Sequence, residues 1–239
     1  MLAIFKREMR SFFTTSVGYI FLASALAVSA IILAVANIFS KTADMSTYFT
    51  GLVVVLMIFL PILTMKSFSE EKRTKTEQLL LTAPVSTTQM VLGKFFSAVV
   101  MYVIFLISTL IFLIPLNVYV AEGASGPGAA LVIGNLFALL LVGMCFIAIG
   151  IFISSLTENQ FAAIVMTIMI LLVLYFVSLF GSLVDTYWIR VVLDWLSIFA
   201  RYTYFTYGIF DIGALIYYIS VTGVLVFLTV RVFEARKYN

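Results

Sequence analysis

Long apolar runs separated by short polar segments make up most of the chain. Six of the runs are long enough to cross a bilayer as a helix, because about 20 apolar residues span its ~30 Å hydrocarbon core. The pattern therefore predicts an all-α, polytopic membrane protein whose residues 1–239 form a single transmembrane domain. The predicted spans are residues 17–39, 48–65, 95–116, 131–153, 161–184 and 212–230.

Residues 1–13 have the pattern of an amphipathic helix. Leu2 and Phe5 belong to an apolar series at helical spacing, whereas Lys6 and Arg7 occupy other positions. We expect this helix to lie on the membrane surface with its cations facing lipid phosphates. A basic flank that only sets topology is the alternative interpretation.

Residues 66–93 form the longest charge-dense segment. Ser67-x-x-Glu70 matches a capping box and predicts a helix start, and Ser86-x-x-Gln89 predicts the start of the following helix. The segment is therefore expected to hold a short cytoplasmic helix between two spans, which could pass the movement of a docked protein to both. The alternative is a solvated hairpin that only connects the spans.

Charge spacing adds detail to that short helix. Glu71 and Lys75 lie four residues apart, as do Arg73 and Glu77, so both pairs are expected to attract each other along one helix face. Pro84 is expected to end the helix.

Residues 185–211 mix apolar, aromatic and charged positions and are too interrupted to span. Because Trp and Tyr settle at the headgroup level, we expect one or two short helices at the outer leaflet or dipping into it. Arg190 and Asp194 lie one turn apart and are expected to pair.

Composition supports the membrane assignment: 64% of residues are hydrophobic and 10% are charged, where a soluble domain would carry about 25% charged residues. The chain has no histidine, which excludes His-based catalysis and imidazole metal ligation. It also has no GxxxxGK(S/T) phosphate-binding loop. The single cysteine, Cys145, lies in an apolar run and is expected to be a small buried residue.

The distribution of Lys and Arg predicts the orientation. Six spans place both termini on one side, together with the segment 66–94, and that side holds 11 of the 14 cations. The positive-inside rule therefore places both termini in the cytoplasm. The cations on that side are Lys6, Arg7, Arg10, Lys66, Lys72, Arg73, Lys75, Lys94, Arg231, Arg236 and Lys237, and those on the other are Lys41, Arg190 and Arg201.

The charged run S-E-E-K-R-T-K-T-E-Q-L-L-L-T-A-P-V-S-T-T-Q-M-V-L-G-K-F (residues 69–95) resembles the coupling segment of ABC-2 type transporter permeases, particularly the six-span gliding-motility type. Residues 5–13, 154–160 and 227–236 resemble the amino terminus, the turn after the fourth span and the carboxyl end of that family. The chain departs from the family pattern where Lys75 replaces a Gly and Glu77-Gln78 replace Leu-Glu. The acidic residue is thus displaced by about 100° around a helix.

The resemblance implies the non-catalytic permease subunit of an ATP-driven ABC transporter in the bacterial inner membrane. ATP and Mg²⁺ would bind a separate, dimeric ATP-binding subunit, and this chain would bind no cofactor, metal or nucleic acid. A second permease copy or a related permease is implied as a partner, and a membrane-anchored auxiliary protein is a further expected one. The residues assigned to ATPase coupling are Glu70, Glu71, Lys72, Arg73, Thr76, Glu77, Leu80 and, after the fourth span, Glu158.

The resemblance also implies an outer gate built from short helices before the last span. The residues assigned to it are Trp188, Arg190, Asp194 and Trp195; an interfacial aromatic belt without a gating role is the alternative. Because the spans hold few polar groups, the expected exported cargo is lipid-linked, amphipathic or peptide-like.

Two rival classes fit poorly. Glu70-Glu71 occurs in intramembrane prenyl-peptide proteases, but that chemistry needs histidines and an Arg where Lys75 stands. A secondary transporter would show ionisable residues at mid-membrane and inverted repeats. A third class stays open, a non-transporting component that passes ATPase-driven motion to an extracellular partner.

Overall fold

The computed structural model is all-helical over the residues that it describes. These are residues 1–40, 42, 44–76, 86–114, 128–181, 187–206, 208 and 210–238. The helices are α1 (Leu2–Thr14), α2 (Ser16–Leu33), the π-helix η1 (Ala34–Ile38), α3 (Ser46–Thr64), α4 (Lys66–Arg73), α6 (Thr87–Thr109), the 3₁₀-helix η2 (Leu110–Phe112), α8 (Ala129–Leu156), α9 (Gln160–Gly181), α10 (Tyr187–Leu196), α11 (Ile198–Thr206) and α12 (Ile212–Tyr238).

Within the described residues, six long apolar helices confirm the expected six-span fold. They contain 22 to 28 residues each, so they rise roughly 33–42 Å and exceed the ~30 Å hydrocarbon core. Their bounds are Ser16–Ile38, Ser46–Arg73, Thr87–Phe112, Ala130–Leu156, Gln160–Gly181 and Ile212–Arg236.

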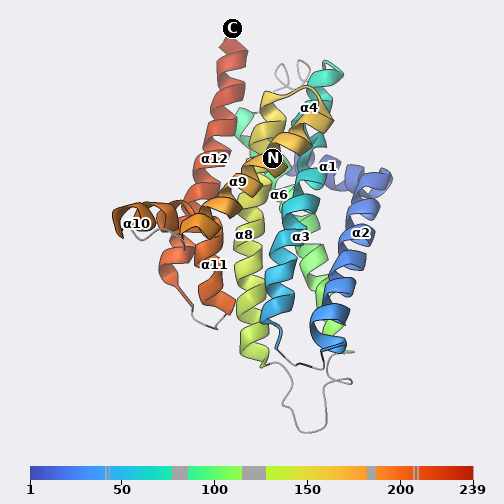
Figure 1. Ribbon diagram of the computed structural model, residues 1–239. Coiled ribbons are helices and arrows are strands. Elements are labelled where there is room, and N and C mark those ends of the chain that lie inside the picture. Colours follow the sequence, from blue (N-terminus) through green and yellow to red (C-terminus); the bar gives the residue numbers. More distant parts are fainter. Residues whose placement is uncertain are drawn as a thin grey trace.

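Helix α8 forms the centre of the bundle. It is the most buried span, with 72% of its apolar window inside, and it packs against α3, α4, α6, α9, α11 and α12 (Figure 1). In helices α2 and α9 only 22% and 17% of the apolar window is buried, so most of their apolar surface faces outward. Cys145 of α8 is buried as expected, with its Sγ 3.2 Å from the Thr222 hydroxyl.

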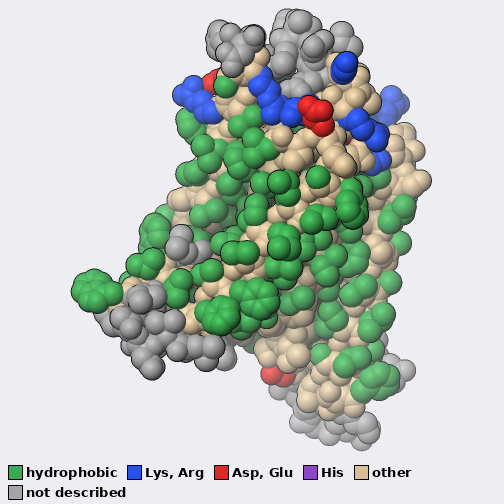
Figure 2. Space-filling model, turned by 45° about the horizontal axis from the view of Figure 1, so that its top comes forward, with side chains coloured by type: hydrophobic (Ala, Val, Ile, Leu, Met, Phe, Trp, Pro, Cys, Tyr) green, Lys and Arg blue, Asp and Glu red, His purple; other side chains and the backbone are tan. Residues whose placement is uncertain are grey.

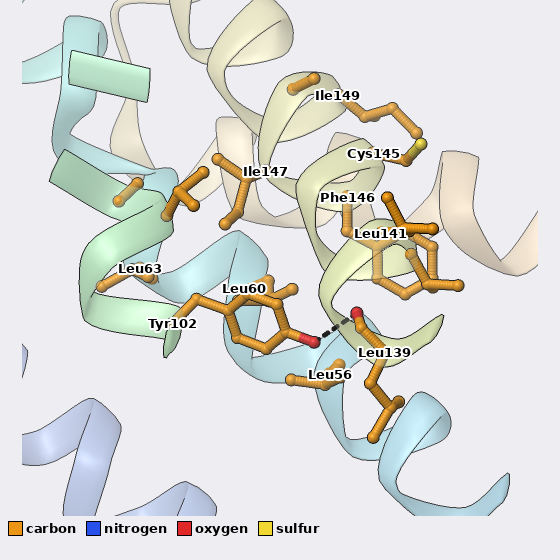
Figure 3. Close-up of a cluster of buried hydrophobic side chains, with 14 of the residues drawn as sticks. Leu56, Leu60, Leu63, Tyr102, Leu139, Leu141, Cys145, Phe146, Ile147 and Ile149 are labelled. Atoms are coloured by element: carbon orange, nitrogen blue, oxygen red, sulfur yellow. Dashed lines mark hydrogen bonds between the residues drawn. The ribbon is translucent and has the colours of Figure 1, made fainter. Parts of the chain in front are cut away.

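Close approach of α6 and α8 depends on a glycine. The Tyr102 hydroxyl donates a 2.6 Å hydrogen bond to the carbonyl of Leu139, which holds the ring against α8 (Figure 3). A Cβ added at Gly143 would lie 2.2 Å from that ring. Small residues at such contacts let helices pack closely in a membrane.

Gly143→Ala is therefore expected to destabilise the bundle by about 1–3 kcal/mol, because the ring must move and strain its hydrogen bond. The measurement is denaturant unfolding of the purified protein in mixed micelles. Gly134→Ala on the same helix is the control, since its added Cβ would meet nothing within 4 Å among the described residues. Equal stability of the two variants would contradict the packing argument.

The charged side chains gather at one end of the molecule. Both termini and α4 lie toward the same end of the bundle in Figure 1, and most charged side chains on the face in Figure 2 form a band there above an apolar surface. This arrangement has the form of a membrane protein with one strongly charged boundary.

Two short helices, α10 and α11, precede the last span, as expected for residues 185–211. In Figure 1 they lie beside the bundle, with α10 projecting away from it. Trp188 and Trp195 on α10 are 76% and 66% exposed. The side chains of Arg190 and Asp194 lie outside the described part of the chain, so their expected pairing is not tested.

Candidate functional site

The charged helix α4 is a direct continuation of the second span. Only Met65 separates it from α3, and Met65 itself has helical backbone angles. The expected capping box at Ser67 is therefore wrong: no side chain caps this end, and Ser67 is buried inside the helical segment. A capping side chain is not needed at the start of α4, because the preceding residues are already helical. Ser86 does cap α6, accepting a hydrogen bond from the Gln89 N–H.

A serine of α8 forms hydrogen bonds with the junction between α3 and α4. The Ser154 hydroxyl accepts hydrogen bonds from the backbone N–H groups of Phe68 and Ser69, both at 3.1 Å. It also donates to the carbonyl of Met65 at 3.0 Å. One buried hydroxyl thus fixes the start of α4 to the end of α8.

A buried ion cluster then joins α4 to α1 and α6. The Lys94 ammonium lies 2.9 Å from a carboxylate oxygen of Glu71 and 3.1 Å from one of Glu8, and it donates a 2.6 Å bond to the Ser67 carbonyl. Arg7 completes the cluster at 2.7 Å from Glu71 and 2.8 Å from Glu8. Two cations thus face two carboxylates across three helices.

Burial makes this cluster different from an ordinary surface ion pair. Lys94 is 2% exposed, while Glu8 and Glu71 are 17% and 15% exposed. Arg7, expected to face lipid phosphates, turns instead to Glu71, because a carboxylate with little access to water needs cationic partners. The cluster makes α1, α4 and α6 one connected unit.

The pKa of the Glu8 carboxyl follows from these contacts. Burial by itself raises the pKa, but the charge of Lys94 and the hydrogen bonds from Arg7 and Lys94 outweigh it and hold the pKa below its ordinary value of 4.5. The folded state therefore binds this proton less readily than the unfolded state does. Its stabilising contribution is complete above the unfolded pKa and is lost as the pH falls through the lowered value.

Acidification below pH 4.5 is accordingly expected to lower the unfolding free energy, and Glu8→Gln is expected to make that pH dependence shallower. The measurement is unfolding in mixed micelles across a pH series from neutral to acid. Glu234→Gln, which removes a partly exposed carboxylate on α12, is the control. A Glu8→Gln protein with the wild-type pH slope would contradict the assigned role of Glu8.

Helix α4 also contacts the turn after the fourth span and the end of α12. Lys72 donates a 3.3 Å bond to the Leu156 carbonyl and lies 3.8 Å from Glu158. The Phe68 ring packs against Phe233 of α12, with ring centres 4.5 Å apart. The segment near Glu158 is thus brought to the same end as α4, as the sequence pattern implied.

The expected coupling residues divide into inward and outward groups. Glu71 and Lys72 face other parts of the chain, whereas Glu70 is half-buried and Arg73 and Thr76 are exposed, as is Glu158. Glu77 and Leu80 lie outside the described residues, and so does the expected Arg73–Glu77 pair. The helix ends at Arg73 and Lys75 has a left-handed φ of 56°, so Glu71 and Lys75 do not share a helix face and Glu71 pairs with Lys94.

Sequence reasoning missed Lys94, Glu8 and Ser154 as partners of α4. Lys94 had a usable signal, because a Lys at the start of an apolar run often has a buried partner. No pattern in the sequence indicated which residue that partner is, since Glu8 lies 86 positions away from Lys94.

Six apolar spans with a charged helical extension at one end define a multi-pass membrane protein. Residues 62–236 match the model of a family described as ABC-2 family transporter protein. The match covers well over half of the chain, so this protein belongs to that family and is an ABC-2 type permease component. The matched region begins in the last turn of α3 and includes α4 and nearly all of α12. A comparison with curated proteins gave no match.

Proposed function

We propose that the chain, acting as one transmembrane domain over residues 1–239, is the permease subunit of an ATP-driven transporter and that α4 is its coupling helix. The observation that carries the proposal is the attachment of α4: it continues α3 and is bonded to α1, α6 and α8. A force applied to α4 by a docked protein would reach four other helices without passing through a loose connection.

The proposed ATP-binding partner docks on the outward group of residues. Glu70, Arg73, Thr76 and Glu158 make the contact, while Glu71 and Lys72 pass the movement to α1, α6 and α8. Glu77 and Leu80 belong to the same docking segment by resemblance. ATP and Mg²⁺ bind the partner, whose closure drives the change between inward- and outward-facing states.

The orientation follows from charge. The end that carries α4 also carries most of the Lys and Arg, so it faces the cytoplasm together with both termini. The resemblance to gliding-motility-type permeases favours a bacterial inner membrane. The outward apolar faces of α2 and α9 would meet lipid or a second permease subunit around the transport path.

The cargo is proposed to be lipid-linked, amphipathic or peptide-like. The polar residues Asn37 and Asn135 both use their amide nitrogens to bond backbone carbonyls of their own neighbourhood. A hydrophilic solute would need polar groups left available along its path. Helices α10 and α11, with Trp188 and Trp195 exposed, are proposed to form the outer gate.

The test is to purify the tagged full-length chain from membranes, identify the proteins that copurify, and reconstitute the complex in vesicles. We expect an ABC ATP-binding subunit in the complex and ATP hydrolysis that rises with an amphipathic cargo. Hydrolysis without cargo movement, coupled to a change in an extracellular partner, would favour the mechanical alternative. A purified chain that binds no ATPase would refute the proposal.

A further inference from the structure

A large groove opens on the side of the bundle away from the ion cluster. It has a volume of about 860 Å³ and lies between α8, α9, α11 and α12. Ligand pockets in proteins commonly measure about 300–1,000 Å³. Ile216 and Val224, which line it, are 59% and 57% exposed, so the groove is open to the surroundings of the spans.

The walls of the groove are apolar and elongated. Residues of α12 from Gly213 to Leu225 form one side, with Phe152 of α8 and Leu174 of α9 opposite. The α12 side is about 18 Å long at 1.5 Å per residue. One leaflet contributes about 15 Å of a ~30 Å hydrocarbon core. The groove therefore matches the length of an extended acyl chain within one leaflet.

One cation, Arg201 of α11, lies in this apolar lining. Its guanidinium stacks over the ring of Tyr217 at 4.4 Å, and its buried Nε has no hydrogen-bond partner within the described part of the chain. No described carboxylate lies within ion-pair distance of it; Asp211, at the start of α12, accepts a bond from the Gly213 N–H instead. A cation in such surroundings is costly unless an anion pairs with it.

Two exposed aromatic residues lie close to Arg201, one in the groove lining and one along α11. Trp195 lines the groove and is 66% exposed, and Tyr204, one turn from Arg201, is 50% exposed. Arginine binds phosphate oxygens through paired charge-assisted hydrogen bonds.

We propose that this groove binds one anionic phospholipid, with an acyl chain along α12 and the phosphate on Arg201. Charge complementarity selects this occupant: a zwitterionic or neutral lipid would fill the apolar walls but would leave the guanidinium less well neutralised. The site is a property of this chain alone and does not depend on the proposed transport function.

The test is native mass spectrometry of the full-length protein taken from nanodiscs that contain equal amounts of phosphatidylglycerol and phosphatidylcholine. Wild-type protein is expected to retain phosphatidylglycerol preferentially. Arg201→Ala should reduce that retention by about tenfold, the size expected for losing charge-assisted hydrogen bonds, and Arg201→Lys should retain part of it. The control is Arg231→Ala, which removes another arginine stacked on an aromatic ring, 4.9 Å from Phe227 but paired with Glu234.

A second variant tests the groove without touching the charge. Ser220→Trp, which places a large side chain in the lining, should reduce retention of both lipids while leaving the thermal transition in place. Unchanged phosphatidylglycerol retention in Arg201→Ala, or equal retention of the two lipids by wild type, would overturn the proposal. Efficient disulfide crosslinking between two Val224→Cys copies, with no lipid retained, would show instead that a second chain covers the groove and would also overturn it.

Discussion

Replacing Lys94 by methionine is expected to lower the unfolding free energy by about 3–5 kcal/mol, because it leaves two largely buried carboxylates with one half-exposed cation. Lys94 is 2% exposed and is the shared partner of Glu8 and Glu71. Methionine has nearly the same length and preserves packing against Phe68, whose ring centre lies 5.0 Å from the ammonium. Unfolding in mixed micelles, followed by helix content, measures the loss.

The loss of stability in Lys94→Met should come from carboxylates left without their cation and not from a change in side-chain volume. The triple variant Lys94→Met, Glu8→Gln and Glu71→Gln removes the opposing charges together and is expected to recover most of the stability, since a neutral replacement of a whole buried ion cluster is often tolerated. Lys66→Met, at a half-exposed position on the same α4 segment, is the matched control. A Lys94→Met protein as stable as wild type would show that the cluster does not hold α1, α4 and α6 together.

The six-span fold could be predicted from sequence because its signal is local. Each span is an uninterrupted apolar stretch, and the environment that it must satisfy, lipid, is the same along its length. The ends of the helices were harder to predict. The second span was expected to stop at Met65, yet the helix continues to Arg73. Polarity marks where a helix leaves the bilayer, but it does not mark where the helix ends.

The candidate site was predictable in its chemistry and not in its connections. The density of charge after Lys66 singled out α4, and the resemblance added Glu158, which lies near Lys72. The partner of Glu71 was expected at Lys75, four residues on, because local spacing was the only rule available. The structure pairs it with Arg7, 64 positions away, and with Lys94. Such pairs depend on the packing of whole helices.

This division of roles leads to a test of the docking residues that spares the fold. Reversing charge at Glu70 and Arg73 together, as Glu70→Lys with Arg73→Glu, is expected to weaken association with the ATP-binding subunit by more than about tenfold, since juxtaposed like charges cost several kcal/mol and 1.4 kcal/mol is a factor of ten. Neither residue takes part in the Lys94 cluster, and Arg73 is exposed. The measurement is the amount of ATPase that copurifies with the tagged chain.

The same variant should unfold at the wild-type denaturant concentration, which separates lost docking from lost structure. Arg231→Glu reverses an exposed cation on α12 and should leave docking unchanged. Glu71→Gln should show the opposite combination, reduced stability with the outward docking residues still in place, because Glu71 faces Arg7 and Lys94. If the Glu70 and Arg73 reversal left the complex and its ATP hydrolysis intact, the docking surface would have to lie elsewhere on the chain, and α4 would be a structural brace between spans.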